Sequence, residues 1–317
     1  MKKRIISVLL ATVFALSVIG CGTKDTKEQD AYRQYGITCM ESGKYEDAVK
    51  AFQNALGESI GHIGEKELDI CFYKAKAQAL DGKTKDALAT YNAIIKYNKD
   101  ARAYYLRGDL YMDMGEEKKG KADFESAVQH GKKKYEIYIG IYESLSRHEK
   151  KDEGQKYLSA AMEIKGDKPE DELYKGRISY LLGENKDAIS YLEKAKEHKQ
   201  MLASYYLGLA YDANGDSDKA KKCIAEYIKS GVATSYDLYE LGMQEMQDGN
   251  YKNALTYFNS GLELEKVPNK QNLMKSAIAA YEYSGDFDSA KKMMKEYLKA
   301  YPDDEEAKHE NTFLETR

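Results

Sequence analysis

The side chains of this chain that could catalyse a reaction or bind a metal ion are its histidines, its cysteines and a few acidic clusters. The five histidines lie far apart in polar stretches: His62, His130, His148, His198 and His309. None of them stands with a Cys, a Ser or a carboxylate in a recognisable catalytic order. The acidic clusters at 216–218 and 303–306 lack the spacing of an EF-hand calcium loop, and no GxGxxG or HExxH motif occurs. The sequence therefore predicts a protein with no catalysis, no cofactor and no metal site.

The first 21 residues differ from the rest of the chain and end on a cysteine. A basic start at 2–4 precedes an apolar run at 5–19, which is the pattern of a secretory signal segment and is too short for a stable membrane span. The run ends in VIGC, which resembles the lipobox of bacterial lipoproteins. The resemblance implies a lipoprotein signal peptide at 1–21, with Cys21 lipidated by acyl chains such as palmitate and the protein anchored to the cell membrane on its extracytoplasmic side. The alternative is an ordinary signal peptide with an incidental cysteine.

The charge of the remaining chain argues against a nucleic-acid partner. Loss of the signal segment removes three of the 49 basic residues and none of the 53 acidic ones, so the mature chain is near −7. No basic block remains, and we therefore expect no binding to nucleic acid. Residues 22–29 (GTKDTKEQ) are predicted to form a short polar tether that holds the following domain close to the membrane.

A pattern of small and bulky residues recurs every 32 to 39 residues. The small residues are Ala48, Ala87, Gly120, Gly154, Ala188, Ala220, Ala254 and Ala290. The bulky residues four positions later are Phe52, Tyr91, Phe124, Leu158, Leu192, Ile224, Phe258 and Met294. A spacing of four places both on one face of a helix, and glycines before each of these helices, with Glu149 as the exception, predict a turn from a preceding helix. The chain is thus expected to be a series of helix pairs.

This unit is similar to the tetratricopeptide repeat, a 34-residue helix–turn–helix, and the similarity is clearest at 235–268. The resemblance implies an all-α fold: a right-handed superhelical solenoid of about eight repeats at 30–302, closed by a C-terminal capping helix at 303–317. Tyr142 and Ile278 occupy positions where the repeat usually has a small residue. We therefore expect the packing of the fourth and eighth repeats to depart from the pattern.

Three cysteines follow the signal segment, and we interpret them as packing residues. Cys39 and Cys71 take inward positions of first helices in neighbouring repeats, and Cys223 lies beside the inward Ile224. A Cys39–Cys71 disulfide is the alternative, and the odd number leaves at least one free thiol outside the cytoplasm.

In the tetratricopeptide repeat family, exposed residues of the first helices line a concave groove that receives a partner peptide. The matching apolar positions of the fifth to seventh repeats are the candidate partner-binding residues: Leu173, Tyr180, Leu202, Tyr205, Leu209, Tyr236, Tyr239, Met243 and Met246. Soluble helices usually carry charge at exposed positions, so a stripe of Tyr, Leu and Met is typical of a binding surface. The alternative is that tight curvature packs these side chains against the facing turn. The first four repeats carry a mixed set there: Arg33, Lys76, Arg102, Tyr105, Asp109, Glu136, Glu143 and Arg147.

These features together predict a membrane-anchored lipoprotein that binds a protein or peptide in its groove and acts as a scaffold at the bacterial cell envelope. One alternative is an extracellular solute or glycan binder that feeds a transporter, with tyrosines stacking on sugars. Trp, the usual strong stacking platform, is absent from the chain. Another alternative is a component of an envelope assembly machine.

Overall fold

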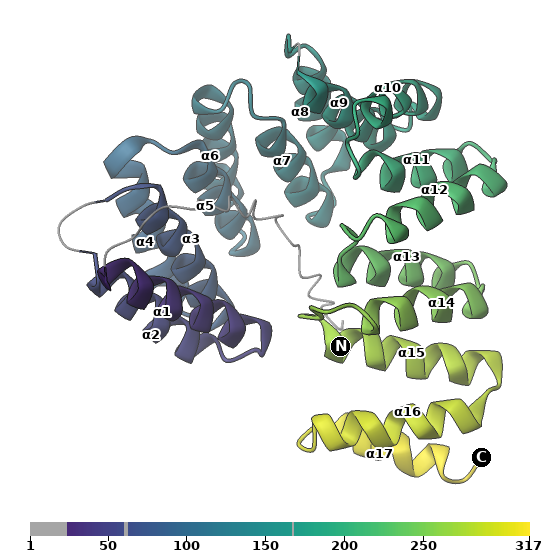
Figure 1. Cartoon of the computed structure of the whole chain (residues 1–317). Helices are drawn as coiled ribbons and strands as arrows, with labels where there is room; N and C mark the ends of the chain where they lie inside the picture. The colour runs from purple at the N-terminus through teal and green to yellow at the C-terminus, as the bar shows by residue number, and fades with distance from the viewer. Residues whose placement is uncertain (1–23, 60–62, 167) are drawn as a thin grey trace. The chain divides into compact units, whose positions relative to one another are not determined.

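The computed structural model describes residues 24–59, 63–166 and 168–317. These residues form seventeen α-helices and contain no strand, which confirms the all-α prediction (Figure 1). The helices fall into two parts, residues 24–229 and residues 230–317, and each part is described by itself.

The first part consists of helix pairs, in which a first helix is followed by a turn and a second helix. Its first helices are α1 (Lys24–Glu41), α3 (Glu65–Leu80), α5 (Ala101–Asp113), α7 (Tyr135–Arg147), α9 (Pro169–Leu182) and α11 (Ala203–Ala213). Its second helices are α2 (Tyr45–Gly57), α4 (Thr84–Asn98), α6 (Glu117–His130), α8 (Lys151–Met162), α10 (Asn185–Glu197) and α12 (Ser217–Lys229). The two helices of each pair lie side by side, as the repeat pattern predicts (Figure 1).

The second part has two further pairs and a terminal helix. Its helices are α13 (Ser235–Gln247), α14 (Tyr251–Leu262), α15 (Lys270–Ser284), α16 (Phe287–Ala300) and α17 (Glu305–Leu314). Ala307 and Leu314 of α17 are buried in one cluster with Met294 and Tyr297 of α16. The terminal helix therefore covers apolar surface of the last pair.

In most pairs the small residue of the first helix receives a large side chain from the second helix of the same pair. A Cβ atom built on Gly242 would lie 2.3 Å from Cε1 of Phe258, and one on Gly36 would lie 2.6 Å from Cε1 of Phe52. Phe52 and Phe258 are both fully buried. Helix approach at this distance needs a residue without a side chain, which is why the glycine recurs with the repeat.

The fourth repeat has a large residue at the small position of its first helix. Tyr142 stands on the first helix where most other pairs have a small residue, and Gly154 stands opposite it on the second helix. A Cβ atom on Gly154 would lie 3.0 Å from Cδ2 of Tyr142. Leu158 of the second helix is fully buried in the same cluster as Tyr142, so in this pair both helices supply a large side chain.

The turns within the pairs have the left-handed backbone conformation that the glycine pattern predicts. Positive φ angles occur at Gly43, Gly82, Gly115, Gly183, Gly215, Gly249 and Gly285. No atom would lie within 4 Å of a Cβ atom added to any of them, so the backbone angle and not the available space selects glycine. Glu149 takes the same conformation at φ 62° without being a glycine.

The first helix begins earlier than the repeat pattern indicates. α1 starts at Lys24, inside the segment predicted as a tether, and Gln29 is buried and donates a hydrogen bond to Glu67 of α3 at 2.9 Å. The predicted signal peptide and Cys21 lie outside the described residues. Over the described residues, no helix combines the length and apolar character that crossing a membrane requires. Cys39, Cys71 and Cys223 are all free thiols, and Cys39 and Cys223 are buried.

Candidate binding face

The candidate binding face consists of the side chains at the predicted groove positions of the first helices. Within residues 24–229, charged side chains make many of these contacts between α1 and α9. The Nη2 atom of Arg33 lies 2.6 Å from Oδ2 of Asp69, which joins α1 to α3. We name this pair, together with Asp109–Arg147 and Glu143–Arg177, the charged ladder.

The charged ladder continues between α5, α7 and α9. Asp109 pairs with Arg147, and Oε1 of Glu143 lies 2.7 Å from Nη2 of Arg177. Burial would lower the pKa of Arg177, but the neighbouring Tyr206 and Glu143 outweigh it and leave that pKa above its ordinary value. The side chains of Glu143 and Arg177 are 26% and 21% exposed, so water screens this pair only in part. The mixed charges of the first repeats therefore bind one another across the repeats.

Two cations on this face have no carboxylate partner among the described residues. Lys76 of α3 is half-buried, and burial lowers the pKa of its ammonium group. The guanidinium carbon of Arg102 lies 3.5 Å from the ring centroid of Phe72, so this cation is held on an aromatic face instead. Phe72 and Lys76 are four residues apart on α3 and share one side of the helix.

The predicted candidates on α9 and α11 are partly used in internal packing. Leu173 is buried, and Tyr180 and Leu202 pack against the same apolar cluster of α9–α12. The ring of Tyr205 lies 5.2 Å from that of the fully buried Tyr227. Leu209 is half-buried. Leu173 therefore has no surface for a partner, whereas the other four keep part of theirs.

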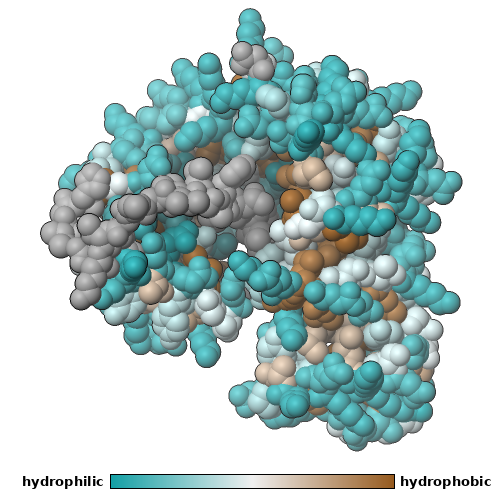
Figure 2. All heavy atoms as spheres, in the orientation of Figure 1, coloured by the Kyte–Doolittle hydropathy of each residue, from teal (hydrophilic) through white to brown (hydrophobic). Residues whose placement is uncertain are grey.

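The predicted candidates on α13 are also partly used in internal packing, since Tyr239, Met243 and Met246 pack against the apolar cluster of α14 and α15. Tyr236, Tyr239, Met243 and Met246 are all half-buried, and we name them the α13 stripe. Tyr239 packs on Phe258 with ring centroids 6.2 Å apart, and Ser276 of α15 donates a hydrogen bond to Sδ of Met243 at 3.6 Å. Apolar atoms come to the surface near α13 and α14 on the face drawn in Figure 2.

The nine predicted residues are thus divided between the two parts of the chain. Leu173, Tyr180, Leu202, Tyr205 and Leu209 lie in residues 24–229, and the α13 stripe lies in residues 230–317. Sequence reasoning missed Arg177, which directly follows the small Gly176 as Glu143 follows Tyr142. Arg177 and Glu143 occupy the same position of neighbouring repeats, and this equivalence could have indicated that the two side chains pair.

A metal centre was sought among the residues that the structure describes. Over residues 24–59, 63–166 and 168–317, no group of three or more His, Cys, Asp or Glu side chains is arranged to hold a metal ion. The polar groups of the face are ion pairs and hydrogen bonds between helices. The arrangement is therefore suited to contact with another molecule by packing and charge.

Comparison with protein families matches several segments of the chain. Three models described as tetratricopeptide repeat match it, at residues 36–95, at residues 101–129, and at residues 202–230 and 271–304. Comparison with curated proteins gives no match. The matched segments include α11 and α15 and lie outside α13.

Solved structures of repeat proteins are similar to this chain at low identity. A tetratricopeptide repeat protein from Parabacteroides merdae is 12% identical, with 80% of this chain and 99% of that chain covered, at a TM-score of 0.47. The Cut9–Hcn1 structure of the APC/C is 15% identical over 92% of this chain and 57% of that chain, at a TM-score of 0.45. PilW, a type IV pilus biogenesis factor, is 16% identical over 78% of this chain and 99% of that chain, at a TM-score of 0.43. At these scores the likenesses carry no functional argument.

Proposed function

We propose, on the premise that the chain is a tetratricopeptide repeat protein, that it is a membrane-anchored lipoprotein scaffold which binds a protein or peptide at the bacterial cell envelope. The first helices carry the binding face, and the α13 stripe is its main contact. The chain acts by bringing its partner to the membrane and not by catalysis.

The observation that carries the binding proposal is the composition of the α13 stripe. Two tyrosines and two methionines are half-buried on a helix whose buried face is already supplied by Leu238 and Leu241. Tyr offers a large contact area at low entropic cost, and Met adapts to irregular shapes. Tyr239, Met243 and Met246 pack in part against the apolar cluster of α14 and α15, and the surface that they leave exposed is what a partner would contact.

Photo-crosslinking in cells tests the binding proposal. A photoreactive residue in place of Tyr239 is expected to give a defined protein adduct. The matched control replaces Tyr283 of α15, which is 68% exposed and lies outside the stripe. An adduct from Tyr239 and none from Tyr283 supports the proposal. Equal adducts from both positions, or an adduct with glycan from Tyr239, would contradict it.

The anchor is proposed from the lipobox alone. Cys21 becomes the mature N-terminus and carries acyl chains, which is enough for stable attachment because two chains bury many methylene groups. Metabolic labelling with a palmitate analogue should mark the full chain and should not mark the Cys21→Ser variant. The matched control is Cys39→Ser, at a buried thiol of α1. Retained label and membrane attachment in Cys21→Ser would overturn the anchor.

A further inference from the structure

A cavity of about 500 Å³ opens between two inter-repeat loops of the first part. One loop joins α6 to α7 and supplies Lys132 and Lys133. The other joins α8 to α9 and supplies Ile164 and Lys165. We name this cavity the lysine pocket, and none of its lining residues belongs to the charged ladder.

The floor of the lysine pocket is apolar and is held in place by α7. Tyr138, Ala160 and Ile164 line it. The hydroxyl of Tyr138 donates to the carbonyl of Lys132 at 3.3 Å, and the hydroxyl of Tyr135 donates to the carbonyl of Ile164 at 3.5 Å. Two tyrosines of one helix therefore hold the two loops.

The loop that carries the two lysines is also fixed from behind. Gly131, at its start, is buried, and a Cβ atom built there would lie 2.9 Å from Cβ of Ala101 and 3.2 Å from Cγ1 of Ile137. This close packing leaves the loop little freedom to move inward. Lys132 and Lys133 therefore stay at the rim.

The rim of the lysine pocket carries an excess of positive charge. Lys132, Lys133 and Lys165 are exposed, and none of them forms an ion pair with a described residue. Elsewhere in this part lysines do pair across helices, as Lys121 does with Glu153 and Lys196 does with Glu226. Glu163 is the single carboxylate of the lining. Asp171 adds a second carboxylate beside Gly166 of the same loop, so three ammonium groups face two carboxylates and the remaining positive charge favours an anion at this rim.

We propose that the lysine pocket binds a phosphate group that carries a short apolar substituent. The volume is within the range of pockets for small molecules, which combine an apolar lining with a few polar groups that orient the ligand. A phosphate presents several oxygens to separate point charges, which suits ammonium groups from two different loops. The substituent packs on Tyr138, Ala160 and Ile164. This site is separate from the peptide-binding face and does not depend on it.

Calorimetric titration of the full chain with phenyl phosphate tests the site directly. Phenyl phosphate is expected to bind more tightly than inorganic phosphate, which lacks the apolar substituent, and more tightly than benzoate, which lacks the phosphate. The variant with Lys132→Gln, Lys133→Gln and Lys165→Gln should bind about tenfold more weakly, because three attractive charges are lost.

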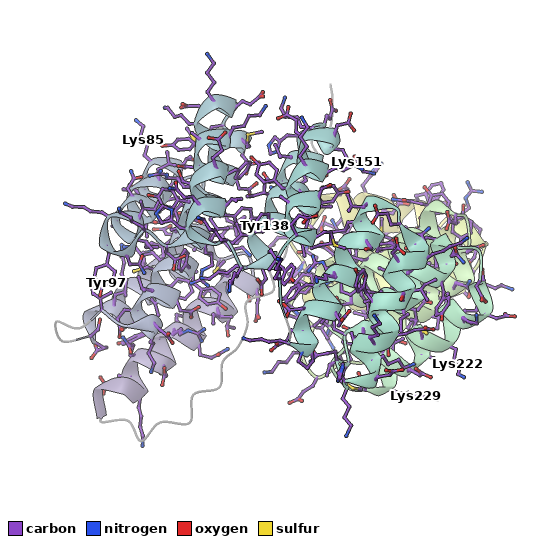
Figure 3. The ribbon with its side chains drawn as sticks, turned by 90° about the horizontal axis from the view of Figure 1, so that it is seen from above. Lys85, Tyr97, Tyr138, Lys151, Lys222 and Lys229 are labelled. Atoms are coloured by element: carbon purple, nitrogen blue, oxygen red, sulfur yellow. The ribbon has the colours of Figure 1, made fainter. Side chains whose placement is uncertain are left out.

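The matched control removes three lysines elsewhere in the same part. Lys85, Lys151 and Lys222 are exposed, form no ion pair with a described residue, and lie at the outer surface in Figure 3, where Tyr138 lies among the helices. Their replacement by Gln lowers the net charge by the same amount and should leave binding within about twofold. An equal loss in both triple variants would show a non-specific charge effect and overturn the proposal.

Two further variants test the charge of the lysine pocket and its apolar space separately. Glu163→Gln should strengthen phenyl phosphate binding, whereas Ala160→Phe should weaken it by filling the floor while every charge stays. If the substitutions only disturbed the local structure, both variants would bind phenyl phosphate more weakly. No gain from Glu163→Gln together with no loss from Ala160→Phe would contradict the site.

The source of the phosphate is resolved by a second arm. Vesicles of phosphatidylcholine with about one third phosphatidylglycerol present the same group on a lipid surface. Binding of these vesicles that is lost in the pocket variant and kept in the control variant assigns a lipid headgroup. Binding of phenyl phosphate alone assigns a soluble ester. Equal behaviour of wild type and the pocket variant in both arms would overturn the proposal.

Discussion

The first helices of residues 24–229 and those of residues 230–317 share one repeat register but use it differently. Asp109 and Glu143 directly follow the small-residue position of α5 and α7, and each pairs with an arginine of the next first helix. Met243 holds the same position on α13 and contacts Ser276 of α15 through its sulfur. The carboxylates and arginines of the charged ladder pair with one another within the chain. The α13 stripe packs in part against the apolar cluster of α14 and α15 and keeps the rest of its apolar surface exposed.

This difference shows why charge on a repeat helix is a poor guide to binding. A carboxylate and an arginine one repeat apart neutralise each other and hold neighbouring repeats in register. A half-buried methionine has no polar group that needs a partner, and its surface remains available for an apolar ligand. The charged ladder stabilises the array of repeats, and we propose that the α13 stripe binds the partner.

The largest expected effect comes from removing the ring beneath the α13 stripe. Phe258→Ala should destabilise residues 230–317 by about 3–5 kcal/mol, because a fully buried ring is replaced by a cavity. Tyr239, which packs on this ring, should lose its position, and crosslinking from Tyr239 should fall. Urea unfolding followed by circular dichroism measures the first effect. Phe258→Leu is the control, and a cost below about 1 kcal/mol for Phe258→Ala would contradict the packing described.

A smaller effect is expected from breaking the charged ladder. Arg177→Met should cost about 1–2 kcal/mol, since it leaves the carboxylate of Glu143 half-buried and unpaired, with the value reduced by partial exposure. The double variant with Glu143→Gln should recover most of this loss, because neither charge then remains. A double-mutant cycle in urea gives the coupling. Additive losses would show that the pair does not interact.

The pH dependence of the second part should follow Asp304, which anchors α17. Its carboxylate accepts hydrogen bonds from Lys275 at 2.7 Å and from the hydroxyl of Tyr297 at 2.5 Å, and these hold its pKa well below its usual range. A depressed pKa in the folded state gives stability that is present above the unfolded pKa of about 3.9 and lost as the pH falls toward the folded value.

Wild type should therefore lose about 1 kcal/mol relative to Asp304→Asn between about pH 5 and pH 3. The measurement is urea unfolding of both proteins at each pH. Asp303→Asn is the matched control, at an exposed carboxylate beside it. A wild-type curve that runs parallel to that of Asp304→Asn would contradict this role of Asp304.

The smallest expected effect is a gain in the free energy of unfolding from a change at the turn of the fourth repeat. Glu149 has φ 62°, a conformation that the other turns give to glycine. Glu149→Gly should stabilise the chain by about 0.5–1 kcal/mol, because the strain of a left-handed non-glycine residue is relieved. Thermal unfolding measures it. The reverse change Gly183→Glu, at φ 83°, should cost a similar amount, and a loss of stability in Glu149→Gly would refute the strain.

The sequence predicted the helix pairs because their signal is local and repeated. Ala254, Phe258 and Gly242 have counterparts in most of the other registers, and the turn glycines mark nearly every reversal. Tyr142 was visible only as a departure, since its accommodation against Gly154 depends on how the two helices approach each other. The sequence pattern predicted the small and bulky positions of each repeat, but not which side chains pack together between the two helices.

The site was less accessible to sequence reasoning. Asp109 and Arg147 were recognised as facing positions, but their pairing depends on how far one first helix lies from the next. Leu173 was predicted to face a partner and is buried, because α9 and α11 pack closely enough to cover it. The lysine pocket joins Lys132 to Lys165 across 33 positions of sequence, and neither loop carries a motif.

The most direct test of the central claim compares the two regions as binding surfaces. The amount of the partner identified by crosslinking from Tyr239 is measured on two purified variants in parallel. One is the α13 stripe variant with Met243→Lys and Met246→Lys, and the other is the charged ladder variant with Glu143→Gln and Arg177→Met. The account predicts loss of the partner from the stripe variant and retention by the ladder variant, with both folded by circular dichroism. Retention by the stripe variant and loss from the ladder variant would contradict it.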